Sequence, residues 1–438
     1  MKVKIHRGVG QIGGCIVEVS AFDKKRRRDT KIMLDCGRNL PPLDDPRAVD
    51  NMEIKGLTSG DSKYDAVFVT HHHADHCGLL GRVNNDIPIY MSSITKGVLD
   101  IVSDFINRRP LRAIETITEG EWISVHNMRI MPLIVSHSAR GAVMYLVEAN
   151  GKRVLYTGDF NDIEENSYRL IKETGTINAL LCEGTNIEIE NEKTEENVLL
   201  RAVQIMEQTN EEIFVLCSTT NINRIEAIAS ACNACSPKRT MVIDQFMNAI
   251  LKQVGYNIRK TIQINRFMSY FVEKGESPRI DKHIWCKDFI PGYIKADELA
   301  AMQNLTIMVR QSMGKFLVRL GRHKLRLKIE GKAKDCNIKR DEVIEQKPFS
   351  NSTLIYSMWT GYKGSKYTSD FLKLCTDLGM KIEDLHISGH AYREQIKTAI
   401  EEIDPITVIP IHTENEEAYK GLHKNITTIP NGKTWSVV

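Results

Sequence analysis

The sequence lacks any apolar run long enough to cross a membrane. A membrane-spanning helix needs about 20 consecutive apolar residues, and no segment of the 438 residues has that composition. The N-terminal stretch from Met1 to His6 also lacks the hydrophobic core of a secretion signal. We therefore expect neither a membrane span nor export, and a cytoplasmic location.

Cysteine is sparse as well. The chain has 10 cysteines, which stand singly apart from Cys232 and Cys235. A structural zinc site needs four ligands, and this pair has no second pair beside it. Small secreted proteins instead cluster their cysteines in a short chain. Reduced thiols are thus expected here, rather than a disulfide framework or a zinc knuckle.

An excess of one charge sign is also missing, because the net charge is only +3. The distribution is more informative than this sum. Between Arg310 and Arg340 there are eleven Lys or Arg residues against two acidic ones, and residues 324–329 alternate cationic and apolar side chains. Period-two alternation predicts a strand, with Arg326 and Lys328 on one open face. That face is either an ordinary solvated surface or a contact for a polyanion.

The chain is rich in metal ligands at one place, residues 71–76. Five of these six residues can bind a metal, in the spacing H-x-H-x-D-H, and they follow an apolar run that ends at Thr70. If His71 and His73 point the same way from an extended turn, and Asp75 and His76 begin a helix, four ligand atoms face one small volume. This geometry predicts two metal ions.

Further ligand-type residues stand where other apolar strands are expected to end. His137 follows the run 128–135, Asp159 follows 153–157, and Glu183 follows 179–182; later strands end at His390 and His412, and an early one ends at Asp35. Binding sites of layered α/β proteins gather at the carboxyl ends of strands. We therefore expect these side chains to meet.

The residue types suit two zinc ions, with Mn²⁺ as the alternative. The first ion would take His71, His73, His137 and Asp159, and the second would take Asp75, His76, His412 and the bridging Asp159. Such a pair activates water for attack at phosphorus. His390 would protonate the leaving oxygen and Glu183 would orient it, while Asp35 would hold a ligand imidazole. The predicted catalytic residues are Asp75, His390, Glu183 and Asp35.

Composition and pattern change between Glu192 and about Ser350. A helix over 194–209, a strand over 213–217 and a helix begun by Asn221 predict a separate α/β domain inserted into the first. The open N–H groups near Asn221 and Arg224 are either simply capped or bind phosphate. We expect three segments: the core over 1–192, the insertion over 193–350 and the rest of the core over 351–438.

The motifs at Asp35, 71–76, His137 and Asp159 resemble those of the metallo-β-lactamase fold. Glu183, His390 and His412 resemble three further motifs of the β-CASP nucleases, and nearly the whole chain is similar to ribonuclease J. The resemblance implies an αββα sandwich with an inserted β-CASP α/β domain, and RNA bound in the cleft between them. It also implies the ligand assignments above, with RNA contacts expected at Asn221, Arg224, Lys363, Ser365, Ser388, Gly389, Arg326 and Lys328.

Two departures from the ribonuclease J pattern affect these contacts. Residues 220–224 read Thr-Asn-Ile-Asn-Arg and lack the usual histidine, and the glycine-rich loop at 360–365 has its own sequence. Lys363 in this loop either meets a phosphate or lies in a surface turn.

Three other functions compete with an RNA-cleaving phosphodiesterase. A DNA-processing β-CASP nuclease usually lacks a histidine at the position of His412. A small-molecule hydrolase would leave the insertion without a purpose, and an inactive RNA-binding scaffold would lack ligands that this chain has. The sequence leaves three questions open: whether cleavage is internal or starts from an end, whether the protein is a monomer or a homodimer, and whether a partner protein supplies specificity.

Overall fold

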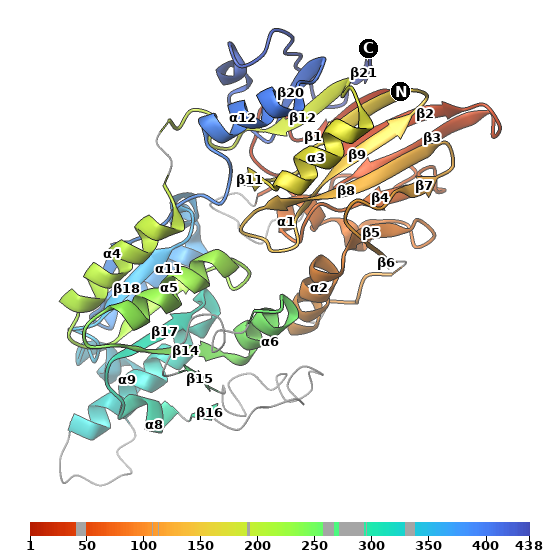
Figure 1. Ribbon diagram of the computed structural model, residues 1–438. Coiled ribbons are helices and arrows are strands. Elements are labelled where there is room, and N and C mark those ends of the chain that lie inside the picture. Colours follow the sequence, from red (N-terminus) through yellow and green to blue (C-terminus); the bar gives the residue numbers. More distant parts are fainter. Residues whose placement is uncertain are drawn as a thin grey trace. The chain divides into compact units, whose positions relative to one another are not determined.

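The structure is a computed structural model that describes residues 1–40, 50–106, 108–112, 114–190, 193–256, 267–270, 293–294, 296–328 and 338–438. The chain divides into two compact units (Figure 1). The first unit combines Met1–Leu40, Val49–Glu192 and Gly389–Val438, and the second contains Lys193–Ser388.

The first unit holds two mixed sheets. One has the strand order β21 (Thr434–Ser436), β1 (Lys2–Arg7), β2 (Ile16–Asp23), β3 (Arg28–Leu34), β4 (Ala66–Phe68), β5 (Ile89–Ser92) and β6 (Ile114–Ile117). The other has the order β11 (Asp162–Ile163), β8 (Met128–Ser136), β9 (Val143–Ala149), β10 (Lys152–Tyr156), β12 (Ala179–Glu183) and β20 (Thr407–Ile411), and β7 (Ile123–Val125) pairs with β8.

These two sheets pack face to face. Alternate residues of their strands, such as Val17 and Val19 in β2 and Tyr145 and Val147 in β9, join one buried core. The outer faces are covered by α1 (Ala74–Cys77) and α2 (Ser93–Phe105) on one side and by α3 (Glu165–Thr174) and α12 (Arg393–Ile403) on the other (Figure 1). The αββα sandwich predicted from the sequence is confirmed.

The second unit is built on a parallel sheet. Its strand order is β16 (Tyr293–Ile294), β15 (Phe267–Tyr270), β14 (Thr240–Asp244), β17 (Leu305–Val309), β13 (Ile213–Cys217), β18 (Thr353–Ser357) and β19 (Lys381–Asp384). Both β13 and β17 are fully buried, and they are apolar except for Thr306 in β17, as expected for strands covered on both faces. The described helices are α4 (Glu195–Gln208), α5 (Ile222–Ala234), α6 (Gln245–Gln253), α8 (Ala296–Ala300), α9 (Gly314–Lys328), α10 (Arg340–Glu345) and α11 (Lys366–Asp377).

The predicted basic strand around residues 324–328 is wrong, because this segment is the end of α9. Six alternating residues are too few to distinguish a strand from a helix. Over the whole helix, the buried residues Phe316, Leu317, Leu320 and Leu325 recur at helical spacing, while Leu327 is exposed. Arg326 and Lys328 therefore do not share the open sheet face that we expected.

The predicted end of the insertion at residue 350 is also wrong. Residues 351–388 belong to the second unit, because β18 pairs in parallel with β13 and β19 pairs with β18. The chain returns to the first unit at Gly389. A buried apolar strand has a similar sequence in either unit, so the sequence of such a strand does not show which unit it belongs to.

The sequence predicts no membrane-spanning helix, and it predicts reduced cysteine thiols. None of the described helices combines the length and the apolar composition that a bilayer crossing requires. Eight cysteines lie in the described part of the chain, and all of them are buried and free. Cys232 and Cys235 are among them.

Candidate metal centre

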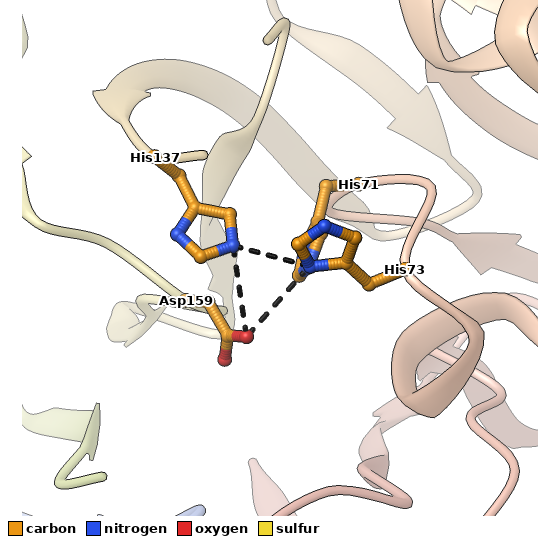
Figure 2. A group of neighbouring side chains, drawn as sticks. All are labelled: His71, His73, His137 and Asp159. Carbon is orange, nitrogen blue, oxygen red and sulfur yellow. Dashed lines mark hydrogen bonds and ion pairs between the residues drawn. The ribbon is translucent and has the colours of Figure 1, made fainter. Parts of the chain in front are cut away.

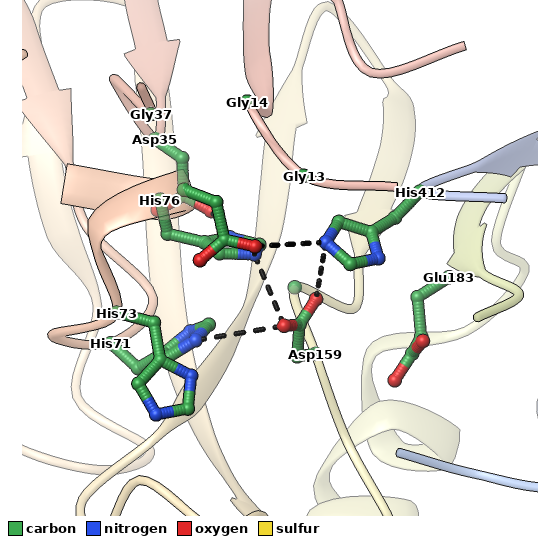
Figure 3. A network of polar contacts seen from close by, with 12 residues as sticks. Gly13, Gly14, Asp35, Gly37, His71, His73, His76, Asp159, Glu183 and His412 are labelled. Atoms are coloured by element: carbon green, nitrogen blue, oxygen red, sulfur yellow. Dashed lines mark hydrogen bonds and ion pairs between the residues drawn. The ribbon is translucent and has the colours of Figure 1, made fainter. Parts of the chain in front are cut away.

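Strand direction brings four of the predicted residues to one edge of the second sheet. β10, β12 and β20 are parallel, and β8 runs with them because β9 is antiparallel to both β8 and β10. His137 follows β8, Asp159 follows β10 and His412 follows β20, and Glu183 is the last residue of β12. Figure 3 shows Asp159, Glu183 and His412 emerging beside one another.

The first sheet contributes the remaining residues from its own strand ends. Asp35 directly follows β3, and His71 lies just beyond β4, which is parallel to β3. His73 is the residue before α1, and Asp75 and His76 lie within α1. The predicted strand, turn and helix around residues 71–76 are therefore present.

One group of four side chains could hold a first metal ion. The ligand atoms of His71, His73, His137 and Asp159 all lie within 4.8 Å of one another (Figure 2). His137 Nε2 lies 3.3 Å from His73 Nδ1 and 3.9 Å from Asp159 Oδ2. His71 Nε2 lies 3.6 Å from the same Asp159 oxygen. The set of three imidazoles and one carboxylate is typical of zinc.

A second group shares Asp159 with the first. It consists of Asp75, His76, Asp159 and His412, again within 4.8 Å of one another. His412 Nε2 lies 3.3 Å from Asp75 Oδ2 and 3.7 Å from Asp159 Oδ1, while His76 Nε2 lies 3.1 Å from Asp159 Oδ2. Asp159 thus presents one oxygen to His71 and His76 and the other to His412 (Figure 3).

Several of the converging atoms have no hydrogen-bond partner among the described residues. His71 Nε2, His76 Nε2 and Asp159 Oδ1 are buried and unsatisfied, and the close approach of His76 to Asp159 lacks hydrogen-bond geometry. Leaving such groups unsatisfied costs about 1–3 kcal/mol each. A cation between them would remove this cost, so these residues fit a divalent metal.

The protonation states of the three histidines in the first group agree with this fit. Burial, followed by the neighbouring imidazoles, lowers the pKa of His71 and His137, and burial lowers the pKa of His73. These rings are therefore neutral near pH 7. A neutral imidazole keeps the lone pair with which it binds a metal.

Three of the candidate ligand rings are oriented through their other nitrogen, as metal-binding imidazoles usually are. His71 Nδ1 lies 3.0 Å from Thr70 Oγ1, His137 Nδ1 lies 2.9 Å from the carbonyl oxygen of Gly389, and His412 Nδ1 lies 2.8 Å from Thr185 Oγ1. Sequence reasoning missed these three contacts. Hydroxyls and backbone carbonyls carry no distinctive pattern that would have found them.

Asp35 does stand where it was predicted, behind His76. Its Oδ2 lies 2.7 Å from His76 Nδ1 and accepts a hydrogen bond of 2.9 Å from the Tyr156 hydroxyl. Its Oδ1 accepts from the backbone N–H of Thr70 at 2.7 Å. Burial alone would lower the pKa of His76, but Asp159, Asp35 and Asp75 raise it above the ordinary value.

Two glycines let the backbone pass close to Asp75. A Cβ on Gly37 would lie 1.7 Å from the carbonyl oxygen of Asp75, which is an impossible approach. Gly13 has φ of +81° and would place a Cβ 3.1 Å from Asp75 Oδ2. The Cys15 N–H donates to the Asp75 carbonyl at 2.9 Å and completes this support. The glycines were not predicted, although Gly37 lies just beyond the strand end predicted at Asp35.

His390 and Glu183 form a pair beside the two ligand groups. His390 Nδ1 lies 3.0 and 3.1 Å from the two oxygens of Glu183 and 3.7 Å from Asp159 Oδ2. Glu183 is buried and also accepts from the backbone N–H groups of Phe160 and Thr185. Burial works against charging His390, but Glu183 and Asp159 raise its pKa to about 9. The ring is therefore a proton donor at neutral pH.

Several predicted substrate contacts have partners within the protein. Arg224 is fully buried and its guanidinium donates to Glu195 and to the carbonyl oxygens of Leu385 and Ile387. We therefore assign it a structural role.

Three further predicted contacts also have partners in the structure. Asn221 caps α5, Ser365 caps α11, and Lys363 is paired with Asp384. Ser388, Arg326 and Lys328 belong to the second unit, whereas Gly389 supports His137 in the first.

Two family matches cover much of the chain. Residues 30–241 match the beta-lactamase superfamily domain, and residues 377–421 match the Zn-dependent metallo-hydrolase RNA specificity domain. Both matches include predicted site residues, because the first spans residues 71–76 and the second spans His390 and His412.

Similarity to individual relatives points the same way. The chain is 23% identical to ribonuclease J of Sinorhizobium meliloti over 97% of its own length and 71% of the relative. It is 31% identical to cleavage and polyadenylation specificity factor 73 of Drosophila melanogaster, over 31% of this chain and 22% of that protein.

A solved structure supports the fold alone. It is a protein of unknown function from Enterococcus faecalis, which shares 21% identity and a TM-score of 0.70 over 99% of both chains. With the αββα sandwich and the strand-end ligands, these matches decide the family. The chain belongs to the metallo-β-lactamase superfamily, among the β-CASP nucleases similar to ribonuclease J.

Proposed function

We propose that the protein is a metal-dependent ribonuclease that hydrolyses RNA phosphodiester bonds with two zinc ions as cofactor. The observation that carries this proposal is the position of Asp159, which belongs to both ligand groups. Mn²⁺ is the alternative metal, since the same nitrogen and oxygen ligands also bind it. When bound, two such ions would activate a water and hold the attacking and leaving oxygens at phosphorus.

The protein itself supplies the ligands and their orientation. His71, His73 and His137 would hold one ion, Asp75, His76 and His412 the other, and Asp159 both. Asp35 keeps the His76 ring turned toward Asp159, since it binds the opposite ring nitrogen at 2.7 Å. Because Asp35 holds the His76 ring, the ring would need little reorientation when the metal binds and during catalysis.

His390 is the proposed general acid. Its raised pKa keeps the ring protonated at neutral pH. Glu183 binds Nδ1 and fixes the ring, so that Nε2 would donate the proton to the oxygen that leaves the phosphorus. Protonation prevents the build-up of negative charge on that oxygen, and such catalysis is typically worth a factor of about 10² to 10⁴.

RNA is the proposed substrate because two matches point to it. The RNA specificity domain match contains His390 and His412, and the ribonuclease J relative aligns over most of this chain. Among the predicted contacts, Asn221, Lys363, Ser388 and Arg326 are partly exposed and Lys328 is exposed, so these residues stay proposals for RNA binding. We also propose a cytoplasmic location, which the buried, free cysteines support.

The test is incubation of the purified protein with RNA labelled at the 5′ or the 3′ end, and with DNA of the same sequence, in Zn²⁺ or Mn²⁺. We expect RNA cleavage that a chelator abolishes. Release of mononucleotides would identify an exonuclease and discrete fragments an endonuclease. Cleavage of DNA alone would overturn the proposal, as would RNA cleavage that survives chelation.

A further inference from the structure

A basic cavity of about 660 Å³ lies in the second unit, between α9 and α11. Four cationic side chains line it: Lys315, Arg319, Arg322 and Arg340. Tyr367 of α11 also lines it, and the described lining includes no carboxylate. The volume is in the range of small-ligand sites, but the lining is far more cationic than the apolar lining that is usual for such sites.

Three of these cations form a row on one face of α9. Lys315, Arg319 and Arg322 follow the spacing i, i+4 and i+7, which places them on one side of the helix, about 6 and about 4.5 Å apart along its axis. Phe316, Leu317 and Leu320 are packed into the core of the second unit. Packing of this buried face fixes the orientation of α9. The face that carries the three cations therefore lines the cavity.

Three of the four cations that line the cavity lack an acidic partner in the described part of the chain. Among the described residues, Lys315, Arg322 and Arg340 have no acidic partner, and Arg322 Nε is buried without a hydrogen-bond acceptor. Lys324, on the same helix but outside the cavity, is instead paired with Glu211 and Glu212. Gathering like charges without counter-charge costs stability, so a bound anion is the natural complement.

Tyr367 adds an aromatic surface to the cationic row. Its side chain is 42% exposed although it lies at the start of α11, a helix whose Thr368, Phe371 and Cys375 are buried. Cations that follow a phosphate backbone beside an exposed aromatic ring are the usual elements of single-strand binding, because every base can stack on such a ring.

We propose that the basic cavity binds a short single-stranded segment of RNA, with phosphates on Lys315, Arg319 and Arg322 and a base on Tyr367. The inference rests on the proposed ribonuclease function, since it assigns a substrate contact for that activity. A row of cations spaced along a helix suits successive phosphates better than the single phosphate group of a metabolite. Free nucleoside triphosphates share this chemistry and are therefore included in the test.

The experiment measures binding of a fluorescent, phosphorothioate-linked single-stranded RNA to the zinc-loaded full chain between 0.05 and 0.3 M salt. The variant R319Q/R322Q should weaken binding about tenfold near 0.15 M salt and reduce the slope of log affinity against log salt by about 1.4, since two phosphate contacts are lost. Tyr367→Leu should weaken binding at least about fivefold and leave the salt slope unchanged, because stacking involves no charge.

The matched control is K366Q/K373Q, which removes the same charge from α11 outside the cavity. Both lysines are ion-paired within their own helix, with Asp370 and Asp377. We expect wild-type affinity from this control. An equal loss of RNA affinity in the control would show general charge attraction and would overturn the proposed site. Displacement of the RNA by equimolar ATP would also overturn it. Should R319Q/R322Q melt at a lower temperature than wild type, the exposed Lys315→Gln gives the same comparison.

Cleavage of an ordinary RNA by the wild type is measured in parallel. If wild type cleaves RNA but R319Q/R322Q binds like wild type, the cavity assignment fails and the proposed function stands. If wild type does not cleave RNA but the cavity variants still weaken binding, the proposed function fails and the binding site stands. If wild type does not bind RNA, both fail.

Discussion

Asp35 and His76 are joined at 2.7 Å through Oδ2 and Nδ1, in the fully buried interior of the first unit. Asp35 adopts φ of +58°, a backbone conformation that costs a non-glycine residue energy. The Tyr156 hydroxyl and the Thr70 N–H both donate to its carboxylate. The interior thus maintains an unfavourable backbone so that one ring nitrogen is held and the other faces Asp159.

We predict that Asp35→Asn weakens the affinity for zinc by about 10- to 100-fold, because loss of the carboxylate frees the His76 ring. Titration of the chelated protein with zinc would measure this change. Tyr156→Phe is the matched control, since it removes one hydrogen bond from Asp35 and keeps the carboxylate. A zinc affinity in Asp35→Asn equal to that of the control would show that Asp35 does not orient a ligand.

His390→Ala should retain its zinc and lose RNA cleavage by about 10² to 10⁴ fold, because only the proton donor is removed. Glu183→Gln should give a smaller loss, since His390 stays but its charged partner is gone. Initial cleavage rates at saturating RNA, together with metal content, would test both variants. Full activity in His390→Ala would remove this residue from the mechanism.

Gly37→Ala should displace α1 and reduce bound metal, since the new Cβ would meet the Asp75 carbonyl. Overpacking of this kind typically costs about 1–3 kcal/mol of unfolding free energy. Gly81→Ala is the control, because a Cβ there would have nothing within 4 Å. Metal content and melting temperature would be compared for the two variants. Equal behaviour of both would contradict the proposed support of Asp75 by the Gly37 backbone.

Glu18 should contribute stability that depends on pH. Burial alone would raise its pKa, but hydrogen bonds from His6 and Tyr64 lower it to about 2 from the ordinary 4.5. The folded pKa lies below the unfolded value, so this stability is full above about pH 4.5 and is lost as the pH falls toward 2. The shift corresponds to about 3 kcal/mol.

Denaturant unfolding of the metal-free wild type and of Glu18→Gln would test this dependence. We expect the variant to be less stable at pH 7, and the difference between the two proteins to shrink between pH 5 and pH 3. A difference that stays constant over this range would show that ionisation of Glu18 is not its source.

The convergence of the candidate ligands was predictable from the sequence, whereas their surroundings were not. His71, His73, Asp75 and His76 are close in sequence, and an extended turn followed by a helix brings their side chains together. His137, Asp159 and His412 each follow an apolar strand, and parallel strands end at one edge. Whether these seven residues bind metal stays a prediction.

The contacts behind the ligands depend on tertiary packing that no local pattern records. Thr185 and Gly389 act through a hydroxyl and a backbone carbonyl. The strand prediction for residues 324–328 was wrong for a related reason. Lys324 is buried and pairs with Glu212, which is distant in sequence. Short-range alternation could not reveal that partner.

The most direct test of the two-metal centre is the zinc content of the purified protein, measured per chain by elemental analysis after zinc loading and dialysis. We predict two zinc ions per wild-type chain and one per chain of His71→Ala/His73→Ala, because only one ligand group is removed. A wild-type chain that holds one zinc ion or none would contradict the shared role of Asp159.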